Sequence, residues 1–247
     1  MKKGELIYEG KAKRVYEALD ADNKIANRYC ILEFKDDLTA FDGEKFDQEE
    51  GKGELNAWVT AVLFKYLSNK QIPNHFVKRL SARELLVQRT KIIPVEVVVR
   101  NIIAGSLEKR LGLTRGMLLN FPVVEFYYKN DLLHDPLLNT DHIQVLGLAN
   151  QAEMRKMTIK AKSVNTLLWQ YFNQREIILV DFKLEFGWTE DKNMLIADEI
   201  TPDTCRLWDH KTTQSLDKDV FRHDIGDVMT GYREIYRRMK EEGLDYV

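Results

Sequence analysis

The sequence has little cysteine and no long apolar run. Cys30 and Cys205 are its only cysteines and lie far apart, so neither a disulfide framework nor a cysteine zinc site is supported. We expect two reduced thiols. No segment approaches the roughly 18 apolar residues that a membrane span needs, and the first lysines are not followed by the apolar stretch of a secretory signal. These absences predict a cytoplasmic protein that has no membrane partner.

An excess of charge of either sign is also absent. The chain has 37 Lys and Arg against 39 Asp and Glu, a formal net charge of -2, which is too balanced for binding nucleic acid mainly by phosphate neutralisation. Its five histidines show no ligand spacing typical of a metal site. The 247 residues, 44% of them hydrophobic, suit a globular protein with a sizeable core. We find no repeat and no linker, so any two lobes should be closely joined.

Hydrophobic patterns predict a small sheet and three helices. Short β-prone segments in the first forty residues alternate with turn-rich ones, which indicates an antiparallel sheet. Apolar residues recur at helical spacing in residues 55–67, 154–172 and 221–239. The second stripe follows a capping box of Asn150 with Glu153, and Gly243 closes the third. We expect all three stripes to pack into the core.

Residues 94–101 (PVEVVVRN) are typical of a strand with charge on one face. The period of two puts three valines on one side and Glu96 with Arg100 on the other. A strand-to-helix turn follows, with Ser106 at the helix start and Gly112 at its end. Free backbone N–H groups and a hydroxyl at such a start suit a phosphate. An ordinary serine cap beside a solvated arginine is the alternative interpretation.

A second strand, residues 177–186 (IILVDFKLEF), has an apolar face opposite three adjacent ionisable groups. These groups are Asp181, Lys183 and Glu185. A polar turn at residues 189–193 predicts a hairpin that brings Asp198 or Glu199 beside them, and the register that chooses between the two stays open. Such carboxylates suit Mg²⁺, which binds through one or two carboxylates plus substrate phosphates. A solvated charged face on an edge hairpin is the alternative.

Two lysines lie on a predicted hairpin near the N-terminus. Residues 10–13 (GKAK) contain Lys11 and Lys13, which as point charges would suit nucleotide phosphates. The segment lacks the Walker pattern, so on its own it favours a plain basic turn.

Five segments, in order, closely resemble the SAICAR synthetase (phosphoribosylaminoimidazole-succinocarboxamide synthase) family. They are residues 10–13, 94–101, 104–106 (AGS), 181–187 (DFKLEFG) and 202–209 (PDTCRLWD). The resemblance covers nearly the whole chain. It implies an α+β fold with a β-rich N-terminal lobe at residues 1–90, a larger mixed lobe at residues 91–247, and ATP in the cleft between them.

The resemblance also implies an ATP-dependent ligase of de novo purine biosynthesis. ATP, carboxyaminoimidazole ribonucleotide (CAIR) and L-aspartate would give the succinocarboxamide ribonucleotide SAICAR, ADP and phosphate, with Mg²⁺ as cofactor. Because a carboxylate is a poor acylating agent, ATP would convert it to an acyl phosphate that the aspartate amine attacks. Positioning and electrostatics would supply most of the rate enhancement. Relatives also lead us to expect a homodimer.

Matching positions carry the family's site residues over to this chain. The nucleotide-phosphate and Mg²⁺ positions are Lys11, Lys13, Glu185 and Asp198. The ribonucleotide-phosphate positions are Arg100, Ser106 and Arg206. The positions at the imidazole end of the substrate, expected to be catalytic, are Asp181 and Lys183. Further substrate-contact segments contain Asp42, Lys129 and Asp135.

Two other functions would use the same residue types. A kinase of a small phosphorylated metabolite would release ADP without aspartate and accumulate a stable phosphorylated product. A nucleotide-sensing module would bind nucleotide without turnover.

Overall fold

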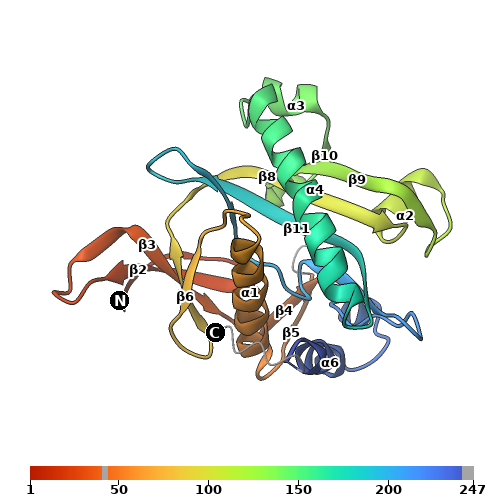
Figure 1. Ribbon diagram of the computed structural model, residues 1–247, viewed down its shortest axis with the longest axis horizontal. Coiled ribbons are helices and arrows are strands. Elements are labelled where there is room, and N and C mark those ends of the chain that lie inside the picture. The colour runs from red at the N-terminus through yellow and green to blue at the C-terminus, as the bar shows by residue number, and fades with distance from the viewer. Residues whose placement is uncertain (41–43, 241–247) are drawn as a thin grey trace.

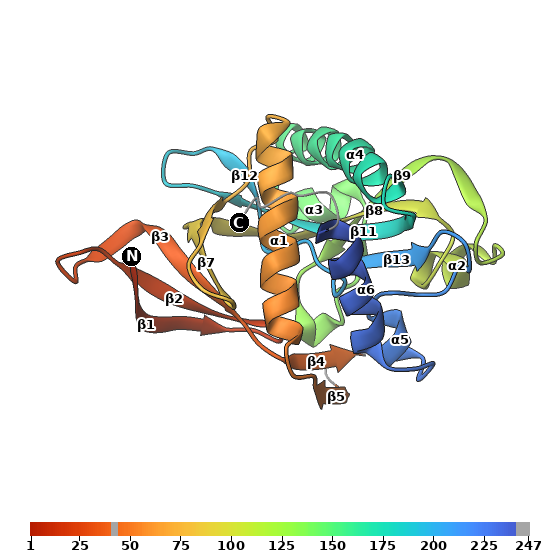
Figure 2. The ribbon, with the colours of Figure 1, turned by 60° about the horizontal axis from the view of Figure 1, so that its bottom comes forward.

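The computed structural model describes residues 1–40 and 44–240. These residues form two large antiparallel sheets and the helices that pack against them (Figures 1 and 2). The first sheet has the strand order β1-β2-β3-β7-β6. Along the chain these strands are β1 (Lys2–Glu9), β2 (Lys13–Leu19), β3 (Ile25–Phe34), β6 (Phe76–Arg79) and β7 (Glu84–Gln88). The sheet predicted in the first forty residues is present, and two later strands extend it. A separate ribbon pairs β4 (Asp37–Ala40) with β5 (Lys45–Gln48).

The second sheet has the order β10-β9-β8-β11-β12, and β13 also pairs with β11. Its strands are β8 (Lys91–Ile102), β9 (Leu118–Tyr128), β10 (Leu137–Leu138), β11 (Ile177–Trp188), β12 (Met194–Ala197) and β13 (Cys205–Asp209). The helices are α1 (Lys52–Asn69), α2 (Ser106–Leu111), α3 (Thr140–Val145), α4 (Gln151–Asn173), α5 (Asp219–Arg222) and α6 (Val228–Lys240), with one 3-10 turn, η2 (Asp131–Leu133). This arrangement confirms the expected α+β class.

Two long helices join and cover the sheets (Figure 2). α1 packs against β3, β6 and β7, while its Val59, Val62 and Leu63 belong to the apolar cluster of the second sheet. α4 packs against β8, β9 and β11. It begins at the predicted capping box, in which Asn150 and Glu153 each bond the other's backbone. Because α1 contributes side chains to clusters on both sheets, the sheets are closely joined.

β8 and β11 are neighbours, and together they present one polar face. Val95, Val97 and Val99 are fully buried on the other face of β8, in the cluster that includes α4. In the antiparallel register, Arg100 lies opposite Asp181 and Glu96 lies opposite Glu185. The predicted charged faces of the two strands therefore form a single surface.

The first half of β11 departs from the predicted alternation. Its pairing with β13 shifts register at residues 179–181. Ile178 and Val180 consequently pack in a small cluster with Trp208, whereas Phe182 and the apolar residues after it pack in the main core. An irregularity of this kind reverses the face that alternate side chains take. The prediction of one unbroken apolar face along this strand is therefore wrong.

The stripe predicted as one C-terminal helix is two helices, α5 and α6, separated by residues 223–227. Gly226 has φ 151°, a backbone conformation that favours glycine. The Asp227 side chain then accepts a hydrogen bond from the Met229 amide at 2.9 Å, which begins α6. The continuous-helix prediction is wrong because these residues end one helix and start another. Gly243 lies outside the described residues.

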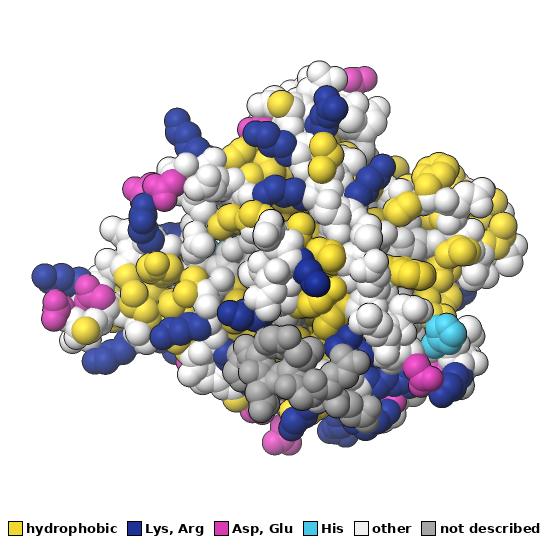
Figure 3. Space-filling view, viewed as in Figure 1, with side chains coloured by type: hydrophobic (Ala, Val, Ile, Leu, Met, Phe, Trp, Pro, Cys, Tyr) yellow, Lys and Arg dark blue, Asp and Glu magenta, His cyan; other side chains and the backbone are white. Residues whose placement is uncertain are grey.

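Charged side chains of both signs are scattered over the face seen in Figure 3, and they do not gather there into one basic stripe. Among the described residues, the helices are all too short or too polar to cross a membrane. Cys30 and Cys205 are buried free thiols, as expected.

Candidate active site

A cavity of about 890 Å³ lies between the polar face of β8 and β11 and the first sheet. The predicted site residues that line it are Lys11, Lys13, Arg100, Lys129, Asp135, Asp181, Lys183, Glu185, Asp198 and Arg206. Ser106 adjoins this set, because its Oγ accepts a hydrogen bond from Arg100 Nη2 at 2.9 Å. Asp42 lies outside the described residues. Motifs that are far apart in the sequence thus meet at one cavity.

Lys13 lies between two carboxylates at one end of the cavity. Its Nζ is 2.6 Å from Asp198 Oδ1 and 2.8 Å from Glu199 Oε1. Burial opposes the charge of Lys13, but the two carboxylates outweigh it and raise the lysine pKa. Burial likewise opposes the ionisation of Asp198, and Lys13 overcomes this to hold the Asp198 pKa far below its usual range. The hairpin register left open whether Asp198 or Glu199 would reach the charged face, and both contact Lys13.

Lys183 and Glu185 extend this group of charges along β11. Lys183 Nζ is 2.7 Å from Glu96 Oε1 and 3.2 Å from Glu185 Oε1, and Lys129 also pairs with Glu185. Burial opposes the charge of both lysines, but the neighbouring carboxylates raise their pKa values. We call Lys13, Lys129 and Lys183, with their carboxylate partners, the lysine cluster.

Lys11 and Asp135 lie near this cluster but have different partners. Lys11 Nζ is 2.8 Å from Asp131 Oδ1, in an exposed ion pair. Asp135 Oδ1 accepts a hydrogen bond from the Asn130 amide at 2.8 Å, which stabilises the turn that follows β9. Lys11 therefore lines the cavity at an exposed position, and an exposed ion pair of this kind contributes little to stability.

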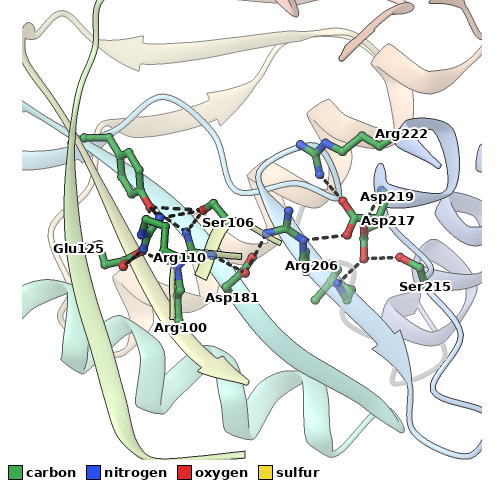
Figure 4. Close-up of polar contacts among 12 residues, drawn as sticks. Arg100, Ser106, Arg110, Glu125, Asp181, Arg206, Ser215, Asp217, Asp219 and Arg222 are labelled. Carbon is green, nitrogen blue, oxygen red and sulfur yellow. Dashed lines mark hydrogen bonds and ion pairs between the residues drawn. The ribbon is translucent and has the colours of Figure 1, made fainter. Parts of the chain in front are cut away.

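Arg100 is almost fully buried at the other end of the shared polar face (Figure 4). Its Nη1 donates to Asp181 Oδ2 at 3.1 Å, and its Nε donates to Glu125 Oε2 at 2.5 Å. Nη2 donates to Ser106 Oγ and to the Tyr127 hydroxyl, both at 2.9 Å. These contacts fix the plane of the guanidinium group, as recognition of a phosphate requires.

Arg206 contacts Asp181 from the opposite side to Arg100 (Figure 4). Its Nη1 donates to Asp181 Oδ2 at 2.9 Å, and its Nε donates to Asp219 Oδ2 at 2.8 Å. A Cβ atom on Gly105, which has φ 57°, would lie 2.5 Å from Arg206 Nη2. Glycine is therefore required for the guanidinium to lie against the turn before α2. We call Arg100, Arg206 and Arg222, with Asp181 and Asp219, the arginine cluster.

Sequence reasoning missed several residues that support this site. Lys52 is fully buried, and its Nζ is 2.6 Å from Asp203 Oδ2. Asp219 accepts hydrogen bonds from both Arg206 and Arg222. Asp203 could have been selected, because it lies in residues 202–209, one of the segments that resemble the family. Its partner Lys52, on α1, is far away in sequence and could not. Asp219 lies just before the stripe of apolar residues in 221–239, and no sequence motif indicated that it would contact the arginines.

The cavity also has an apolar portion that would suit a flat heterocycle. Val15, Leu32, Val87 and Ile92 line it, from both sheets. His75 lies alongside, with Nε2 3.1 Å from the Asp198 carbonyl oxygen. Burial lowers the His75 pKa to about 4, so its ring is neutral near pH 7.

The carboxylates of the lysine cluster fit a divalent cation. Glu199 Oε2 is buried and, within residues 1–40 and 44–240, has no hydrogen-bond partner. It is next in sequence to Asp198, and Glu185 is nearly fully buried in the same cavity. The same ranges contain no group of three or more metal-ligating side chains. A set with few protein ligands suits Mg²⁺ better than Zn²⁺, because Mg²⁺ keeps waters and phosphate oxygens in its shell.

The chain is similar over nearly its whole length to one group of known proteins. The SAICAR synthetase family profile matches residues 6–239. The phosphoribosylaminoimidazole-succinocarboxamide synthase of Brevibacillus brevis is 52% identical over 239 residues, which cover 97% of this chain and 98% of that protein. The protein of the same name from Thermococcus sibiricus is 53% identical over 233 residues, which cover 94% and 97%.

Solved structures agree with the sequence comparison. A SAICAR synthetase in complex with ADP has a TM-score of 0.89 and 49% identity, covering 95% of this chain and 97% of that one. SAICAR synthetase from Pyrococcus horikoshii OT3 has a TM-score of 0.87 and 49% identity, covering 94% and 98%. The agreement of profile, sequence and structure over the same residues means that this chain belongs to the SAICAR synthetase family.

Proposed function

We propose that the chain is an ATP-dependent ligase that joins L-aspartate to CAIR, forming SAICAR, ADP and phosphate in purine biosynthesis. The observation that carries this proposal is the presence of two cation clusters along one cavity. Lysines with carboxylates at one end suit a Mg²⁺–nucleotide, and oriented arginines at the other suit a sugar phosphate. Strand β11 contributes to both clusters, so the two substrates would be held next to each other.

In the proposed mechanism, Lys11, Lys13 and Lys129 bind the phosphate chain of ATP. Glu185 and Asp198 would hold Mg²⁺, which when bound would offset phosphate charge. A carboxylate oxygen of CAIR attacks the γ-phosphorus, the bond to the β-phosphate oxygen breaks, and ADP leaves. The resulting acyl phosphate is attacked by the aspartate nitrogen, which loses a proton as phosphate departs. The protein contributes positioning and charge stabilisation and forms no covalent bond to substrate.

Arg100, Arg206 and Ser106 bind the ribonucleotide phosphate in this proposal, and Asp181 orients both guanidinium groups. Lys183 lies two residues further along β11, between that phosphate site and the nucleotide end. It would stabilise negative charge at the carboxyl group during phosphoryl transfer. We assign Asp42 and Asp135 to substrate contact, and Asp135 also stabilises the turn that presents Lys129.

Several further properties belong to the same proposal. We assign lobes to residues 1–90 and 91–247, which is supported by the change of sheet between Gln88 and Lys91. A homodimer is expected from the family resemblance, as is a cytoplasmic location, which the buried free thiols suit.

A coupled assay with ATP, CAIR and L-aspartate, each omitted in turn, tests the proposed function. We expect ADP and SAICAR to form only when all three are present with Mg²⁺. ADP release without aspartate, together with a stable phosphorylated product, would instead identify a kinase. Nucleotide binding without any turnover would identify a sensing module.

A further inference from the structure

Lys218 differs from the other cations that line the cavity. Every other lysine or arginine of the lining has a carboxylate partner, as the lysine and arginine clusters and Lys11 show. Within the two described ranges, the Lys218 ammonium forms neither a hydrogen bond nor an ion pair. Its side chain is half-buried and lines the cavity. A partly desolvated cation without a partner favours an anionic ligand.

Lys218 has electrostatic neighbours in both clusters. Its electrostatic neighbours on one side are Asp203 and Glu199, and Glu199 contacts Lys13 of the lysine cluster. On the other side its neighbour is Arg222, whose Nη1 is 2.6 Å from Asp219 Oδ1 in the arginine cluster. In the proposed reaction the amine attacks a carboxyl group activated by the nucleotide, so the third substrate would have to bind next to both clusters.

Arg222 provides a second cation on the same side of α5. Its amide donates to the Lys218 carbonyl at 3.0 Å, so the two residues are one helical turn apart, where side chains are neighbours. Both line the cavity. We propose that Lys218 and Arg222 bind the carboxylates of the amino-acid substrate and so place its amine toward the activated carboxyl group. This assignment rests on the proposed ligase function and adds the site for its dicarboxylic amino acid.

The protonation of Lys218 agrees with this role at neutral pH. Burial lowers its pKa to about 8, Asp203 opposes that decrease, and Arg222 and Lys52 add to it. The ammonium form, which attracts a carboxylate, is therefore present at pH 7 and is lost as the pH rises above about 8. Because a bound carboxylate raises the pKa of the lysine, substrate should retain this proton.

Kinetics of the Lys218→Gln variant test the site. We expect the KM for L-aspartate to rise about tenfold or more, with the KM values for ATP and CAIR within about threefold of the wild type. Lys218→Arg, which keeps the charge, should recover part of the loss. Lys211→Gln is the matched control, since Lys211 is exposed and pairs with Glu176 at the surface. An unchanged aspartate KM, or a fall in kcat alone, would overturn the binding role.

Direct binding separates this inference from the proposed function. Succinate has both carboxylates of aspartate but no amine, and calorimetry on the full chain with ADP present measures its binding without turnover. We expect binding to the wild type and to Lys211→Gln, and its loss in Lys218→Gln with an unchanged thermal midpoint. Equal binding by all three proteins would overturn the site. Succinate binding by a wild type that shows no aspartate-dependent turnover would instead contradict the ligase function alone.

In the wild type, we also expect the aspartate KM to rise between about pH 8 and pH 9, with a smaller change in Lys218→Arg because its guanidinium stays charged. The same rise in both proteins would contradict the role of the Lys218 ammonium.

Discussion

The two ends of the cavity hold cations in different ways. In the lysine cluster, Lys13 and Lys183 each contact two carboxylates as point charges. In the arginine cluster, Arg100 and Arg206 donate from separate nitrogens to fixed partners, which orients each guanidinium plane. Lysine contacts can rearrange around a flexible polyphosphate and its metal, whereas oriented planar groups suit one phosphate at a fixed position. Cation type, as well as charge, therefore distinguishes the two proposed substrate sites.

Removing Lys13 should have the largest effect on the lysine end. Lys13→Met would leave Asp198 and Glu199 buried together without their cation, so we expect kcat/KM for ATP to fall about 100-fold or more. Steady-state kinetics at saturating CAIR and aspartate measure it. Lys24→Met, at an exposed lysine outside the cavity, is the control. A loss of less than about threefold would remove Lys13 from the nucleotide site.

Arg100→Ala should raise the KM for CAIR about tenfold or more, equivalent to about 1.4 kcal/mol or more of binding free energy. Arg100→Lys should recover little of this loss, because an ammonium cannot reproduce contacts from three nitrogens. Lys13→Arg, the reciprocal change, should retain more activity than Arg100→Lys. A matching loss for ATP alone would show that Arg100 belongs to the nucleotide site.

Glu185→Gln keeps the shape of the side chain and removes its charge. We expect the Mg²⁺ concentration for half-maximal activity to rise about fivefold, since a neutral amide is a weaker ligand for a hard cation. A magnesium titration at fixed ATP measures this change. Activity that stays the same across the titration would count against a metal role for Glu185.

Asp219→Asn should have the smallest kinetic effect, about threefold on the KM for CAIR, because a neutral amide can still accept from Arg206. Burial opposes ionisation of Asp219, but Arg206 and Arg222 overcome it and lower the Asp219 pKa to about 2. The stability from this shift is therefore present above about pH 4 and lost as the pH falls toward 2. Urea unfolding should show the wild-type advantage over the variant shrinking across that interval. A constant difference would contradict the assigned ion pairs.

The charged face of β8 could be predicted from sequence because strand alternation is local. Glu96 and Arg100 lie on one face in the structure, as the period of two requires. Partners supplied by other strands could not be predicted in this way. Glu125 reaches Arg100 from β9, and that contact depends on a pairing register that has no local signature.

The hairpin after β11 shows a different limit of sequence reasoning. Alternation would send Asp198 and Glu199 to opposite faces, so only one of them was expected at the charged surface. Asp198 instead has φ 63°, a left-handed conformation just after β12 ends, and both carboxylates reach Lys13. Backbone conformations of this kind at non-glycine residues follow from tertiary contacts, and the sequence did not indicate this one.

The course of β11 has a consequence for the spacing of the groups that would anchor the two proposed substrates. Asp181 belongs to one cluster and Glu185 to the other, four residues later on the same strand. At about 3.3 Å per residue, the backbone separates their Cα atoms by about 13 Å. The repeat length of a hydrogen-bonded strand in the interior of a sheet would thus set the distance between the protein groups that anchor the two proposed substrates, whose reacting ends would meet between them. Inserting one residue there would lengthen the distance between Asp181 and Glu185 and turn one of these side chains toward the apolar core.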